Sequence, residues 1–239
     1  MRSAVKLLGI LGIVLLSSMA FANDIYITQC GDNLDLDIVQ DGTDNVIGTS
    51  TTAVSLTGDD MTFDIKQTGN YNTITAVIKG ATYTGDWDIT GNSNEIDLLC
   101  SSTTTGSCDT VTLTVAATGD DNDFTINIGE TSDSDSATVA FTVTGDNNII
   151  NSSLDGKNAN ITVALDNSAS LSTNSANSDE GVAVTLDIDG DGDSAGHTVD
   201  LDITGGGGTV DVTQSGIYDN TVDLTISGDD FDVDITQSD

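Results

Sequence analysis

Residues 64–78 read DIKQTGNYNTITAVI, and this stretch carries two amides where an alternating strand pattern places apolar side chains. Apolar and polar residues alternate up to Ile65, so Gln67 continues the apolar face. Beyond the glycine corner, Asn72 leads a second apolar series. Buried amides are therefore expected on both sides of the corner. Each needs hydrogen-bond partners, because an unsatisfied buried amide costs about 1–3 kcal/mol.

The same corner recurs along the chain. Segments 40–45 and 67–72 share the pattern Q-x-G-x-x-N, and looser versions occur at 29–33 and 214–220. Corner glycines often return after 11 residues, which is enough for one short strand and one corner. A strand, a tight corner and a second strand cannot bury a face alone, but stacked copies of this unit can. The repeat therefore favours stacked coils.

The fold class predicted from these features is all-β. The chain has no proline, so every backbone N–H can donate to a strand ladder, and Thr, Val, Ile, Gly, Asp and Asn dominate it. We expect a β-solenoid of strand–turn–strand coils; the alternative is an antiparallel β-sandwich in which Gln and Asn mark turn edges. In a solenoid, equivalent amides lie one above another and form a ladder. The predicted ladder positions are Gln29, Gln40, Gln67, Gln214, Asn45, Asn72 and Asn220.

The N-terminal residues predict export. Arg2 and Lys6 precede an apolar run, and Ala20-Phe21-Ala22 offers small residues at cleavage spacing, so residues 1–22 are interpreted as a signal peptide. Residues 23–239 are expected to form a single elongated solenoid domain, secreted to the extracellular space or cell surface. Ser/Thr-rich, acidic or Asn-rich stretches predict loop insertions near 100–109, 130–137 and 166–181.

Charge limits the classes of partner. The formal net charge is −34, and loss of Arg2 and Lys6 with the signal peptide makes it −36. Such a surface repels nucleic acid and anionic lipid and attracts cations and cationic partners. No segment after the signal peptide is long and apolar enough to span a membrane, so nucleic-acid binding and a membrane span are not expected.

Three cysteines follow the signal peptide. Cys100 and Cys108 flank the loop SSTTTGS and are predicted to form a disulfide in an oxidising compartment. Cys30 is left over and is either free or paired between molecules. The spacing matches no common zinc pattern.

The stretch LDIDGDGDSAGHTVD suggests a calcium loop. Asp187, Asp189, Asp191 and Asp193 recur at every second position, and Asp200 lies downstream. Calcium takes six to eight oxygen ligands, which a Gly-rich acidic loop can supply. The stretch departs from an EF-hand loop at its last ligand position and has no helical flanks. A solvated acidic corner without bound metal is the alternative interpretation.

Enzymatic activity is not expected. His197 is the only histidine, and no nucleophile-elbow motif accompanies it. The abundant aspartates recur with the strand period, as in LDLDI at 34–38, which indicates a solvated face rather than a catalytic pair.

The Q-x-G-x-x-N corners with flanking alternating strands resemble the curlin-type repeats of bacterial curli fibre subunits. Segments 40–45 and 67–72 carry the resemblance, while aliphatic residues replace the glutamine in other repeats. The resemblance implies self-assembly into an extracellular, amyloid-type filament or biofilm matrix, with a nucleator or another fibre subunit as a further partner. The alternative function is a monomeric calcium-dependent adhesin or surface-binding β-solenoid.

Overall fold

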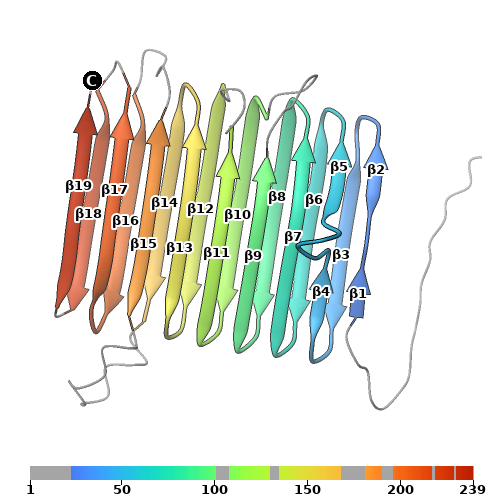
Figure 1. Cartoon of the computed structure of the whole chain (residues 1–239), viewed down its shortest axis with the longest axis horizontal. Coiled ribbons are helices and arrows are strands. Elements are labelled where there is room, and N and C mark those ends of the chain that lie inside the picture. Colours follow the sequence, from blue (N-terminus) through green and yellow to red (C-terminus); the bar gives the residue numbers. More distant parts are fainter. Residues whose placement is uncertain are drawn as a thin grey trace, which may run out of the picture.

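The computed structural model describes residues 23–100, 108–129, 135–167, 181–189, 196–216, 219–228 and 230–238. These residues form a β-solenoid, in which strands of successive coils stack into two facing parallel sheets along a rod (Figure 1). The signal peptide predicted for residues 1–22 lies outside the described residues, as do the central parts of the three predicted loop insertions.

The first sheet, called sheet A, has eleven strands in the described residues. Its strands are β1 (Asn23–Ile25), β2 (Thr28–Cys30), β4 (Asn45–Ile47), β5 (Val54–Thr57), β7 (Tyr71–Lys79), β9 (Ser93–Cys100), β11 (Asp121–Ile128), β13 (Asn148–Asp155), β15 (Val182–Asp189), β17 (Gly208–Ser215) and β19 (Phe231–Ser238).

The second sheet, called sheet B, has eight strands in the same residues. They are β3 (Asp35–Asp41), β6 (Met61–Thr68), β8 (Thr82–Thr90), β10 (Thr110–Thr118), β12 (Ser136–Thr144), β14 (Ala159–Asp166), β16 (Thr198–Gly205) and β18 (Thr221–Gly228). From β6 onward the chain alternates between the sheets, so each coil contributes one strand to each (Figure 1).

All pairings between the named strands are parallel, which confirms the β-solenoid and is incompatible with the antiparallel sandwich. Paired residues lie 22 positions apart at Thr68 and Thr90, which equals two 11-residue units. The interval grows to 38 between Asp166 and Thr204, on either side of residues 168–180. Additional residues are therefore placed between strands without shifting the register.

The core lies between the sheets. Inward side chains alternate with outward ones along each strand, and the inward set is aliphatic with a few aromatic rings. Trp87 packs edge-on against Phe63, with ring centroids 5.9 Å apart, and its indole Nε1 donates to the Phe63 carbonyl oxygen. Phe124 and Phe141 stack across the two sheets at 6.3 Å. Within the described residues there is no helix long and apolar enough to cross a membrane.

Candidate functional site: amide ladders and open coil ends

A column of asparagines runs through the corner that leads into sheet A. Each side-chain Nδ2 except that of the last member donates to the Oδ1 of the asparagine in the next coil, over distances from 3.2 Å down to 2.6 Å. All members are buried, with exposed fractions of 0–1%. The amides thus satisfy one another inside the rod, as expected for stacked identical side chains. The members, in order, are Asn45, Asn72, Asn94, Asn122 and Asn148.

The corner glycine makes room for this column. A Cβ added to Gly69 would lie 2.8 Å from Asn45 Nδ2 and 2.9 Å from Asn72 Oδ1. The asparagine also holds the corner closed, since Asn122 Nδ2 donates to the Gly119 carbonyl oxygen three residues earlier. The G-x-x-N pattern is therefore one structural unit: the glycine admits the neighbouring amides, and the asparagine satisfies the corner backbone.

Glutamines form two shorter stacks. Gln67 Nε2 donates to Gln40 Oε1 at 2.7 Å, at the end of sheet B strands β6 and β3. Gln237 Nε2 donates to Gln214 Oε1 at 2.8 Å, on sheet A strands β19 and β17. The first stack stops at Gln67 because Ile89 follows it in register. Residues 64–78 thus carry amides of two separate ladders: Gln67 before the glycine corner and Asn72 after it.

Two predicted ladder positions do not stack on an amide side chain of a neighbouring coil. Gln29 is in register with Leu56, and its Nε2 donates to the Gly31 carbonyl oxygen of its own corner. Asn220 lies at a corner leading into sheet B, where its Oδ1 accepts the backbone N–H of His197. Both differ from the prediction because sequence alone does not say which sheet a corner feeds.

The structure adds four members to the ladders: Asn94, Asn122, Asn148 and Gln237. The asparagines had a visible signal, since each follows a corner glycine by three residues. Gln237 had no such signal, since no glycine lies two residues after it.

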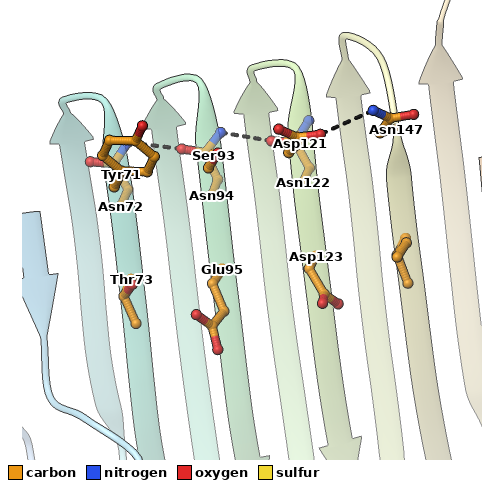
Figure 2. A pocket seen from close by; sticks show the side chains of 11 residues that line it. Tyr71, Asn72, Thr73, Ser93, Asn94, Glu95, Asp121, Asn122, Asp123 and Asn147 are labelled. Atoms are coloured by element: carbon orange, nitrogen blue, oxygen red, sulfur yellow. Dashed lines mark hydrogen bonds between the residues drawn. The ribbon is translucent and has the colours of Figure 1, made fainter. Parts of the chain in front are cut away.

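Outside the asparagine column, the same corner carries a shallow groove along β7, β9, β11 and β13 (Figure 2). Its upper row is Tyr71, Ser93, Asp121 and Asn147, of which the first three are paired in register from coil to coil. Asn147 Nδ2 donates to Asp121 Oδ1 at 3.0 Å, a contact drawn in Figure 2. The groove is thus the solvent side of the ladder corner.

Within the described residues, nothing covers either end of the rod. At the C-terminal end, the inward residues Val233 and Ile235 are 39% and 40% exposed, although Val210 and Val212 in the preceding coil are buried. At the N-terminal end, Ile25, Ile27, Leu34 and Leu36 are only partly buried. Strand edges and apolar side chains thus face solvent together, which is the arrangement that pairs with further strands.

Acidic side chains cover the outer faces. Asp200 pairs in register with Asp223, and Asp211 with Asp234, so carboxylates stack along the rod. Burial first, then the nearby carboxylates of Asp135 and Asp59, raises the pKa of Asp109. Ion pairs between coils join Lys66 to Asp88 at 2.7 Å and Lys157 to Asp135 at 2.6 Å.

The predicted calcium ligands are not gathered by the described strands. Asp187 and Asp189 are exposed on β15 of sheet A, whereas Asp200 is exposed on β16 of sheet B. Asp191 and Asp193 lie outside the described residues. Across the described ranges, no group of three or more His, Cys, Asp or Glu residues is arranged to hold a metal. Calcium binding by the loop stays a prediction.

The cysteines differ in their surroundings. Cys100 and Cys108 form a disulfide, with a Cα–Cα distance of 5.9 Å, at the foot of the loop between β9 and β10. This is the pairing predicted from the sequence. Cys30 is free and exposed at the end of edge strand β2.

His197 is a buried corner residue. Its ring Nδ1 accepts a hydrogen bond from the backbone N–H of Ala159 at 3.1 Å. The backbone N–H of His197 donates to Asn220 Oδ1. The imidazole therefore ties adjacent coils together at a corner of sheet B. The structure gives it a structural role that the sequence did not indicate.

No protein-family model, curated protein or solved structure matches this chain.

Proposed function

We propose that the protein is a secreted structural subunit that polymerises into an extracellular filament through edge-to-edge addition of β-coils. The observation that carries the proposal is the exposure of strand edges and apolar side chains at the two rod ends. In the described part of the chain, the outermost strands of both sheets have one edge without a strand partner, and partly exposed apolar residues accompany them. A solenoid that worked as a monomer would benefit from blocked ends, because open edges promote association.

The internal repeat supports addition along the rod axis. A coil added at either end meets the same columns of inward residues that the chain already stacks internally. Pairing between molecules would therefore reuse contacts that are formed many times within one molecule. The ladder amides matter here as internal stiffening, since each asparagine bond links one coil to the next.

Electron microscopy of the purified chain comprising residues 23–239 tests the proposal. We expect unbranched filaments about as wide as one rod after incubation at moderate salt, with β-rich circular dichroism before and after assembly. A matched variant, Val233→Lys, places a charge at the exposed C-terminal end and should remain folded but fail to elongate filaments. Monodisperse rods of the unmodified protein at high concentration would contradict the proposal.

A second function, a calcium-dependent adhesin acting as a monomer, is favoured by the stacked outward carboxylates. Asp200–Asp223 and Asp211–Asp234 present oxygen pairs on both faces near the C-terminal end. This alternative requires that millimolar calcium, but not magnesium, raises the melting temperature of rods that remain monomeric. The same microscopy separates it from the filament subunit.

A further inference from the structure

The two sheets differ by one level, where a level is one strand position along the rod axis. β1 and β2 share a level, as do β4 and β5, so sheet A has nine levels in the described residues and sheet B has eight. The described chain therefore begins and ends on sheet A. If β1 and β2 of a second copy were placed directly on β19, that copy's β3 would lie two strand spacings, roughly 10 Å, from β18. Simple end-to-end stacking leaves an empty level in sheet B.

The last strand repeats the first in sequence. Residues 24–30 read DIYITQC, and residues 232–238 read DVDITQS. They also match in register: an unbroken series of pairings puts Gln29 and Gln237 in one inward column of sheet A, at its two ends. The column is Gln29, Leu56, Ile78, Cys100, Ile128, Leu154, Ile188, Gln214 and Gln237. β19 thus carries the side chains that β4 and β5 accept from β1 and β2.

β1 and β2 are weakly held. They are two three-residue strands separated by Tyr26 and Ile27, and their partners are separated by residues 48–53. Ile25 and Ile27 are only partly buried, and β1 and β2 contact sheet A on one edge. In contrast, β19 is one continuous eight-residue strand. Exchange would place one continuous strand where the chain has two short ones.

We infer that assembly occurs by strand replacement: β19 of one copy displaces β1 and β2 of the next and pairs with its β4 and β5. This inference rests on the proposed filament function. Replacement removes the surplus level, so β18 comes directly beside β3 of the next copy. Val222, Leu224 and Ile226 would then stack on inward β3 residues that occupy the same columns, namely Leu36, Ile38 and Gln40.

The rival geometry is direct stacking of β1 and β2 on β19. It has one attraction, since Gln29 of the second copy would extend the Gln214–Gln237 stack. Its cost is the empty level in sheet B, which would leave the inward faces of β18 and β3 unpaired. The two geometries place different residues beside Ser238: Thr57 of the next copy in replacement, and Cys30 of the next copy in direct stacking.

Disulfide trapping in filaments of the full chain separates the two. A triple variant, Cys30→Ser, Thr57→Cys and Ser238→Cys, is assembled and then oxidised. Replacement predicts intermolecular cross-links between positions 57 and 238, because directly paired residues lie within disulfide reach. Direct stacking separates these positions by about two strand spacings, roughly 10 Å, beyond that reach. The matched control is Cys30→Ser, Ser215→Cys and Ser238→Cys, which pairs two neighbouring strands within one chain.

A pair of point variants gives a second, kinetic measurement. Ile27 and Ile235 occupy equivalent inward positions in the first and last strands. Under replacement, Ile27→Asn loosens the strand that must leave and should speed seeded growth about tenfold, since more ends are competent. Ile235→Asn weakens the incoming strand and should slow growth by a similar factor. Direct stacking predicts that both variants slow growth, because both strands would lie in the interface.

The outcomes are separable. Filaments with 57–238 cross-links and opposite kinetic effects support strand replacement. Filaments without that cross-link, although the control forms its disulfide, overturn replacement and leave the filament function standing. Cross-linked dimers that do not extend also overturn it, because they indicate a closed end-to-end pair. Absence of any assembly in the unmodified chain overturns both proposals.

Discussion

At the scale of single residues, the buried amides show why a polar group can occupy an apolar face. Asn94 Oδ1 accepts from Asn72, and its Nδ2 donates to Asn122 and to the Thr118 carbonyl oxygen. Every polar atom of that side chain is therefore used within the rod. An isolated buried amide would lack these partners and would destabilise the fold.

Replacing Asn94 by alanine tests the ladder. The change removes two links: Asn72 Nδ2 loses its asparagine acceptor and Asn122 Oδ1 loses its asparagine donor. We therefore expect a loss of about 1–3 kcal/mol in the free energy of unfolding. Chemical denaturation of the monomer measures it. Asn92→Ala is the control, because Asn92 is an exposed residue of the same corner. Equal stability of the two variants would show that the ladder contributes nothing beyond the corner itself.

At the scale of one strand, β8 shows how a glycine and a large ring share an inward face. Tyr83, Gly85 and Trp87 all point inward, and the side-chain space of Gly85 is filled by the Tyr83 ring. Gly85 does not serve a turn; it sits in the middle of a strand, where glycine is otherwise unfavourable. The missing side chain at Gly85 leaves room for the Tyr83 ring.

Gly85→Ala should therefore destabilise the protein. The added Cβ would overlap the Tyr83 hydroxyl and approach Leu113 Cδ1 to 3.1 Å, so the core must shift at a cost of about 1–3 kcal/mol. Thermal unfolding followed by near-ultraviolet circular dichroism measures the loss. Gly181→Ala serves as control, since a Cβ there meets no atom within 4 Å. A melting temperature unchanged by Gly85→Ala would indicate that the ring relaxes freely.

At the scale of the whole molecule, a rod with open ends carries a large negative charge. The net charge of −34 opposes the approach of a second rod, and the effect reaches about 30 Å at 0.01 M salt but only about 8 Å at 0.15 M. Within one rod, burial first and then the carboxylates of Asp135 and Asp59 raise the pKa of Asp109. Its raised folded-state pKa means that the stability linked to its protonation is present at low pH and is lost as the pH rises through that pKa.

Filament growth should depend on salt, because salt screens the repulsion between acidic rods. We expect the rate of seeded growth to rise with sodium chloride, and to rise further with calcium, because both reduce repulsion between acidic faces. Light scattering with fixed seed numbers measures the rate. Magnesium at equal ionic strength is the control: an equal effect indicates charge screening, and a larger effect of calcium indicates bound calcium. Identical growth in low salt with chelator would remove electrostatic repulsion as the barrier.

The sequence by itself determined the class of fold and the burial of Gln67 and Asn72. These follow from local rules, because alternation gives strands, glycine gives corners, and an amide on the apolar face requires hydrogen-bond partners. It also marked Cys100 and Cys108 as a pair, since only the seven-residue stretch SSTTTGS lies between them.

Only the tertiary structure decided which amides share a column. Sheet assignment depends on the cumulative length of every preceding coil, and insertions of unequal size separate positions in sequence that are adjacent in space. For this reason Asn220 meets His197 rather than another ladder asparagine, and Gln29 lies over Leu56. The same cumulative register put Gln29 and Gln237 at opposite ends of one column, a relation that no local pattern contains.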